Sequence, residues 1–96
     1  MPILTNKEID AALKELTAWQ LSGNEIKKTY KCKNFKTALQ FVNIVGELAE
    51  EEDHHPDILI HNWNKVTLTL STHNEGGLTA KDFDLATKIE KFYHNF

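Results

Sequence analysis

The segment VTLTLSTH, residues 66–73, alternates apolar and polar side chains as far as Ser71. Because successive side chains of a strand point to opposite faces of the sheet, this alternation predicts a strand with one buried face. Val66, Leu68 and Leu70 then face the core, while His73 lies on the polar face at the end of the strand. A strand buried on one face only is typical of an antiparallel sheet that is covered on one side.

Helical spacing of apolar residues marks three other segments. Thr5 and Glu8 have the spacing of a capping box, and amphipathic residues follow them, so a first helix begins there. Asn34 can cap a second helix with a broad apolar face, which we expect to end near Asp53. Thr79 can cap a final helix, which runs to the last residues of the chain.

Two hairpins fill the intervals between the predicted helices. Residues 19–32 form two strand-like runs around the turn at residues 22–24, and residues 58–73 form two more around the turn at residues 62–65. The predicted fold class is therefore α+β, with the order α-β-β-α-β-β-α. We expect a four-stranded antiparallel sheet with three helices packed on one face.

Length and composition limit the classes of protein to consider. The 96 residues predict a single domain over residues 1–96, and 41% hydrophobic and 26% charged residues indicate an ordinary folded protein. The net charge of -3, without a stripe of Lys or Arg, argues against direct binding of nucleic acid. No segment approaches the ~20 apolar residues of a membrane span. We therefore expect a cytoplasmic protein without membrane contact, in which the lone Cys32 is a small, partly buried strand residue.

The end of the second predicted helix is unusually acidic. Helix C-termini favour cations, yet this one carries Glu47, Glu50, Glu51, Glu52 and Asp53. These carboxylates would favour the imidazolium forms of the two histidines that follow, His54 and His55. A solvated acidic face is the alternative interpretation. Neither histidines at helical spacing nor several cysteines are present for a metal site, and no serine-nucleophile motif occurs, so we expect proton transfer.

Three further residues complete this candidate site. Pro56 restricts His55 to extended geometry, and His73 could converge on the His-His-Pro bend across the second hairpin. His73 could equally just cap the end of its strand. Asp82, three residues after Thr79, either caps the last helix or orients His73. The remaining histidines, His61 and His94, are interpreted as surface residues.

Seven positions of the sequence together resemble the signature of the pterin-4a-carbinolamine dehydratases. They follow the pattern Glu-x3-His-His-Pro-x6-Trp-x9-His-x8-Asp, formed by Glu50, His54, His55, Pro56, Trp63, His73 and Asp82. The resemblance implies dehydration of 4a-hydroxytetrahydropterin to quinonoid dihydropterin in tetrahydrobiopterin recycling, with the pterin as substrate and no cofactor or metal. It also implies a homodimer or homotetramer, and an aromatic amino-acid hydroxylase as a partner.

The resemblance also assigns roles to residues. It implies that His54, His55 and His73 are catalytic, and we favour His54 and His73 as acid and base, with His55 holding the pterin. The implied substrate-binding residues are Asp53, His54, His55, Ser71, Thr72, His73 and Asn74, and the implied supporting residues are Glu50, Pro56, Trp63 and Asp82. The competing hypothesis is a protein-interaction module, such as the dimerisation cofactor of a transcription factor or a partner of a hydroxylase.

Overall fold

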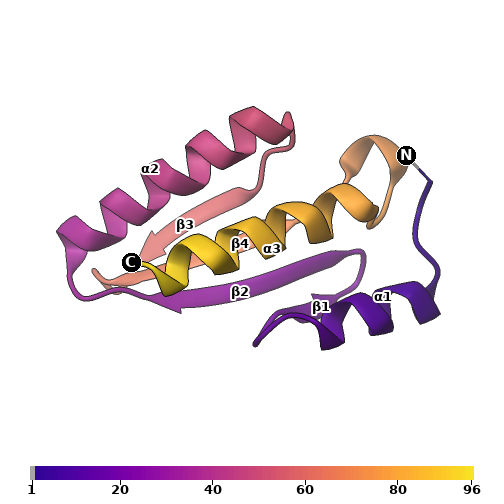
Figure 1. The fold of residues 1–96 in the computed structure, drawn as a ribbon, viewed down its shortest axis with the longest axis horizontal. Helices are drawn as coiled ribbons and strands as arrows, with labels where there is room; N and C mark the ends of the chain where they lie inside the picture. The colour runs from indigo at the N-terminus through magenta and orange to yellow at the C-terminus, as the bar shows by residue number, and fades with distance from the viewer. Residues whose placement is uncertain (1) are drawn as a thin grey trace.

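The structure is a computed structural model that describes residues 2–96, so Met1, which the single-domain prediction includes, lies outside the described residues. Helices and strands alternate along the chain in the predicted order (Figure 1). In sequence they are α1 (Asn6–Lys14), β1 (Gln20–Ser22), β2 (Glu25–Lys31), α2 (Phe35–Glu52), β3 (Asp57–His61), β4 (Lys65–Leu70), the 3-10 helix η1 (His73–Glu75) and α3 (Ala80–His94).

The four strands form one antiparallel sheet in the order β1-β2-β4-β3. Each hairpin supplies one edge strand and one central strand, and the hairpins join where Ile26 pairs with Leu70 and Tyr30 pairs with Val66. The sheet and the three helices confirm the predicted fold class.

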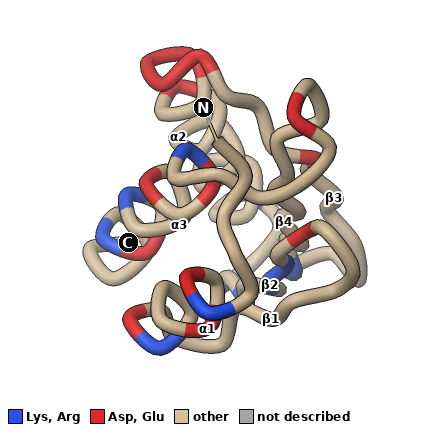
Figure 2. Tube along the Cα trace, turned by 90° about the vertical axis from the view of Figure 1, so that its right-hand side faces the viewer, with Lys and Arg blue, Asp and Glu red and all other residues tan. Residues whose placement is uncertain are grey.

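The helices all cover the same face of the sheet (Figure 2). Val66, Leu68 and Leu70 are fully buried on this face, as the alternation predicts, and they join a core that includes residues of α1, α2 and α3. The opposite face carries polar side chains. On it the Thr67 hydroxyl lies 2.8 Å from the Thr29 hydroxyl and 2.7 Å from Nε2 of His61.

The helix caps explain why the helices begin where they do. Thr5 and Glu8 form the predicted capping box at α1, and the Asn34 side chain accepts a hydrogen bond from the amide of Thr37 at the start of α2. Thr79 caps α3. No helix within residues 2–96 combines the length and the apolar character needed to cross a membrane.

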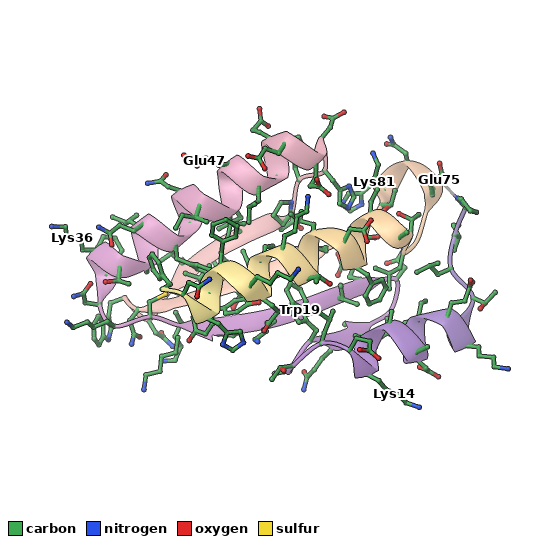
Figure 3. All side chains as sticks on the ribbon, viewed as in Figure 1. Lys14, Trp19, Lys36, Glu47, Glu75 and Lys81 are labelled. Carbon is green, nitrogen blue, oxygen red and sulfur yellow. The ribbon has the colours of Figure 1, made fainter. Side chains whose placement is uncertain are left out.

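A buried polar cluster ties the second half of α3 to the middle of the sheet, away from the predicted histidine site. Oε1 of Glu90 accepts hydrogen bonds from Nε1 of Trp19 at 3.1 Å, from the Tyr30 hydroxyl at 2.5 Å and from Nζ of Lys28. Figure 3 shows Trp19 beside α3. Burial alone would raise the Glu90 pKa, but the bonds from Lys28 and Tyr30 outweigh it and hold this pKa below its ordinary value. Burial, reinforced by Glu90, raises the Tyr30 pKa.

One boundary prediction is wrong, because the last strand ends earlier than the alternation suggests. Strand β4 ends at Leu70, and His73 begins η1 instead of ending the strand. The reason is the partner strand. Leu70 pairs with Ile26, next to the β1–β2 turn, so β2 offers almost no further backbone for pairing.

Candidate active site

A cavity of about 230 Å³ lies where the end of α2 meets the loop after β4. The antiparallel pairing of β3 with β4 brings these two segments together, because Asp57 at the start of β3 lies opposite Thr69 near the end of β4. The cavity is lined by Asp53, His54, His55, Ser71, Thr72, His73 and Asn74. The seven residues predicted to bind substrate, including all three candidate catalytic histidines, thus surround one cavity.

The end of α2 directs its histidines through a left-handed turn. Asp53 has φ 49° and ψ 45°, and the amide of His54 donates to the carbonyl of Ala49 at 3.0 Å, five residues back. This is the hydrogen-bond pattern of a Schellman motif, in which the left-handed position is usually glycine. Aspartate tolerates that conformation better than most residues. The chain therefore reverses at Asp53, and His54 is directed back toward α3.

His54 is buried against the first turn of α3. Its Nε2 lies 2.5 Å from Oδ1 of Asp82, a carboxylate with no exposed surface. Oδ2 of Asp82 accepts hydrogen bonds from the amide of Thr79 at 2.9 Å and from the hydroxyl of Thr72 at 2.8 Å. The capping role of Asp82 is confirmed. The histidine that it contacts is His54 and not His73, because the Schellman turn places His54 beside α3.

His55 points to the other side of the bend and stays exposed. Its Nε2 lies 2.5 Å from Oε2 of Glu50, one turn back on α2. Pro56 follows and leads directly into β3, so His54 and His55 contact different carboxylates. Glu52 also pairs with Lys88 of α3, and this hydrogen bond raises the Lys88 pKa. Two carboxylates of the acidic helix end thus have partners, so this end is more than a solvated face.

The loop after β4 supplies the opposite wall of the cavity. His73 and Asn74 are exposed on η1, which turns back at Gly76 with φ 76°. Ser71 donates to the carbonyl of Asn24 at 2.7 Å, and Nδ2 of Asn24 donates to the carbonyl of Gly76 at 3.3 Å. Asn24 thus holds both ends of the loop from the first hairpin. Sequence reasoning missed this role, because an asparagine after a glycine predicts only a turn.

Trp63 is the signature residue that lies away from the cavity. It occupies the β3–β4 turn, at the end of the hairpin opposite to Pro56, with φ 57° and 62% of its surface exposed. Asn62 before it also has a positive φ, of 49°. Trp63 therefore does not line this cavity, and its supporting role stays a prediction.

The other histidines do not line the cavity. His94 is exposed on the last turn of α3, as predicted, and His61 is partly buried on the open sheet face. Within residues 2–96 no group of three or more His, Cys, Asp and Glu side chains is arranged to hold a metal ion. Cys32 is buried just after the end of β2 rather than partly buried within a strand as predicted, and its burial raises the pKa of the thiol.

The chain matches one family model and several named sequences. A family model described as pterin 4 alpha carbinolamine dehydratase matches residues 2–92. A protein of Roseiflexus sp. (strain RS-1) named "Putative pterin-4-alpha-carbinolamine dehydratase" is 53% identical over 88 residues, which are 92% of this chain and 94% of that protein. A protein of the same name from Sulfolobus acidocaldarius is 48% identical over 88 residues, covering 92% and 96% of the two chains.

Solved structures share the fold. The crystal structure of a transcriptional coactivator/pterin dehydratase from Brucella melitensis matches with a TM-score of 0.89 and 36% identity, over 95% of this chain and 98% of that one. A pterin dehydratase-like protein, identified as a RuBisCO assembly factor in the alpha-carboxysome, matches with a TM-score of 0.68 and 19% identity over 80% and 90% of the two chains, which shows the fold alone. With the family model matching nearly the whole chain, these findings show that the chain belongs to the pterin-4-alpha-carbinolamine dehydratase family.

Proposed function

We propose that the chain dehydrates 4a-hydroxytetrahydropterin to quinonoid dihydropterin, as a step in tetrahydrobiopterin recycling. The observation that carries the proposal is the cavity at which His54, His55 and His73 meet, with His54 held by the buried Asp82. Family membership supports the same activity.

The reaction needs two proton transfers. The leaving 4a-hydroxyl takes up a proton and departs as water, and the bond between carbon 4a and oxygen breaks. The neighbouring ring nitrogen forms a double bond to carbon 4a and loses its own proton. Imidazoles titrate near neutral pH and can serve both steps without a cofactor. His54 and His73 act as acid and base in this proposal, while His55 holds the pterin together with Ser71 and Asn74. The Thr72 hydroxyl, which the resemblance also assigns to the substrate, donates to Asp82 instead.

Single substitutions of the histidines test the proposal. General acid-base catalysis typically contributes about 10² to 10⁴-fold, so His54→Ala and His73→Ala should each lower the dehydration rate by a factor of this order. The matched control is His94→Ala, which removes an exposed histidine remote from the cavity and should leave the rate unchanged. Full turnover by a folded His54→Ala variant would contradict the assignment.

A protein-interaction role is the second candidate function. A shallow groove of about 820 Å³ runs along α2 and β3, lined by Val42, Asn43, Gly46, Glu47, Glu50, Glu51 and Ile58. Phe35 and Leu39 on α2 are also exposed, at 50% and 41%. A surface of this kind fits the homodimer or homotetramer that we propose, and it could also receive a hydroxylase or a transcription factor.

One comparison separates the two functions. A variant that lacks all three cavity histidines should lose dehydratase activity, whereas a pure interaction module would keep its partner and its oligomeric state. Light scattering with size-exclusion chromatography measures the oligomeric state directly, and a monomer at micromolar concentration would contradict the proposed homo-oligomer.

A further inference from the structure

Two buried hydroxyl groups are connected by hydrogen bonds to the carboxylate that contacts His54. The hydroxyl of Thr72 is 2.8 Å from that of Thr79 and 2.8 Å from Oδ2 of Asp82. Asp82 and Thr79 have no exposed surface, and Thr72 is 9% exposed. Burial matters here because hydrogen bonds in a low-dielectric environment are strengthened, and a missing partner is costly.

The donors and acceptors that these three side chains carry fix the direction of each hydrogen bond between them. The carboxylate of Asp82 only accepts when ionised, so the single hydroxyl hydrogen of Thr72 is used for Oδ2. In the contact between the two threonines, Thr72 must then accept and Thr79 must donate. The Thr79 oxygen remains an acceptor for the amide of Lys81, at 3.3 Å.

The donors that Asp82 already receives also decide the tautomer of His54. Oδ2 of Asp82 receives two donors, and the carboxylate lies in the first turn of α3, where the helix dipole favours an anion. The proton between Oδ1 of Asp82 and Nε2 of His54 therefore belongs to Nε2. In neutral His54 the unprotonated nitrogen is then Nδ1, for which no hydrogen-bond donor is found within residues 2–96.

We propose that Nδ1 of His54 is the nitrogen that exchanges a proton with the substrate, and that Thr72 and Thr79 are positioning residues that hold Asp82 so that Nε2 stays protonated. This inference rests on the proposed dehydration and deepens it, because it names the reacting atom of His54. The threonines act through Asp82: they orient the carboxylate, the carboxylate orients the imidazole, and the imidazole presents one free lone pair.

The tautomer can be measured without any substrate. Long-range proton–nitrogen NMR spectra of uniformly ¹⁵N-labelled protein distinguish a protonated ring nitrogen from an unprotonated one, and the His54 signals are assigned by their loss in His54→Asn. At a pH where His54 is neutral, we expect Nε2 to carry the proton. A proton on Nδ1 in the unsubstituted protein overturns the inference.

Substitution of Thr72 tests the positioning role. Thr72→Val keeps the shape and removes the hydroxyl, so His54 should show mixed tautomers and kcat should fall about 10-fold, as expected for the loss of one hydrogen bond to a charged group. KM should stay within about 2-fold, and Thr72→Ser, which restores the hydroxyl, should recover most of kcat. Thr67→Val, which removes a hydroxyl from the open sheet face, is the matched control and should change neither parameter.

The outcomes separate this inference from the proposed function. A raised KM with unchanged kcat in Thr72→Val would make Thr72 a substrate contact and overturn its positioning role. If Thr72→Val does not fold, the tautomer of the unsubstituted protein still decides the inference. A protein that has the predicted tautomer but no dehydratase activity would overturn the proposed function and leave the hydrogen-bond assignment intact.

Discussion

Replacing Glu90 by glutamine should destabilise the fold by about 2 kcal/mol at pH 7. The side chains of Lys28 and Glu90 are only 11% and 10% exposed, and breaking a buried ion pair by removing one partner costs about 3–5 kcal/mol. The amide oxygen of glutamine can still accept from Trp19 and Tyr30. Lys28 also keeps its contact with the Tyr30 ring, 4.5 Å from Nζ to the centroid, which offsets part of the loss.

The contribution of Glu90 to the free energy of unfolding depends on pH. Because the pKa of Glu90 is lowered by folding, its contribution to stability is fully present above the ordinary glutamate pKa of about 4.3 and is lost as the pH falls through the lowered value. The difference in unfolding free energy between the unsubstituted protein and Glu90→Gln should therefore be largest near pH 7. It should shrink below about pH 4.

Urea unfolding followed by circular dichroism measures this difference. For a domain of this size, about 2 kcal/mol corresponds to a loss of about 8–16 °C in Tm and about 1 M in the urea midpoint. Glu15→Gln, at the exposed end of α1, is the matched control and should stay within about 0.5 kcal/mol. A Glu90→Gln variant as stable as the control at pH 7, or a difference that grows in acid, would refute the reasoning.

Substitutions at three further positions follow from the geometry. Asp53→Val should cost about 1–2 kcal/mol, because a β-branched residue resists the left-handed conformation, whereas Asp53→Gly should be close to neutral; urea unfolding compares the two. Trp63→Gly should stabilise the β3–β4 turn by about 0.5 kcal/mol, because two consecutive left-handed residues favour Asn-Gly, and a fall in Tm would contradict this. Glu50→Gln should leave stability unchanged within about 0.5 kcal/mol, since its contact with His55 is exposed, and should lower kcat/KM less than His55→Ala does in the dehydration assay.

The fold was predictable because local patterns and tertiary packing agree. Alternation placed Val66, Leu68 and Leu70 in the core, and the capping residues Thr5 and Thr79 marked the starts of α1 and α3. The end of β4 was not predictable from alternation alone. A strand ends where its partner ends, and the pairing of β4 with β2 is set by the packing of the two hairpins.

That the three histidines lie together was predictable, but the contacts that each of them makes were not. Signature spacing placed His54, His55 and His73 in one set, and the structure brings them around one cavity. The contact between Asp82 and His54 joins residues 28 positions apart, and sequence spacing carries no information about which histidine faces α3. The contacts of Thr72 with Asp82 and of Asn24 with Gly76 depend in the same way on tertiary packing.

The measurement that tests the central claim most directly is the dehydration rate of freshly generated 4a-hydroxytetrahydropterin with purified protein, beside a folded His54→Ala, His73→Ala double variant. We predict rapid dehydration by the unsubstituted protein and a rate near the uncatalysed background for the double variant. Equal rates for the two proteins would contradict the claim that the histidine cavity carries out this chemistry.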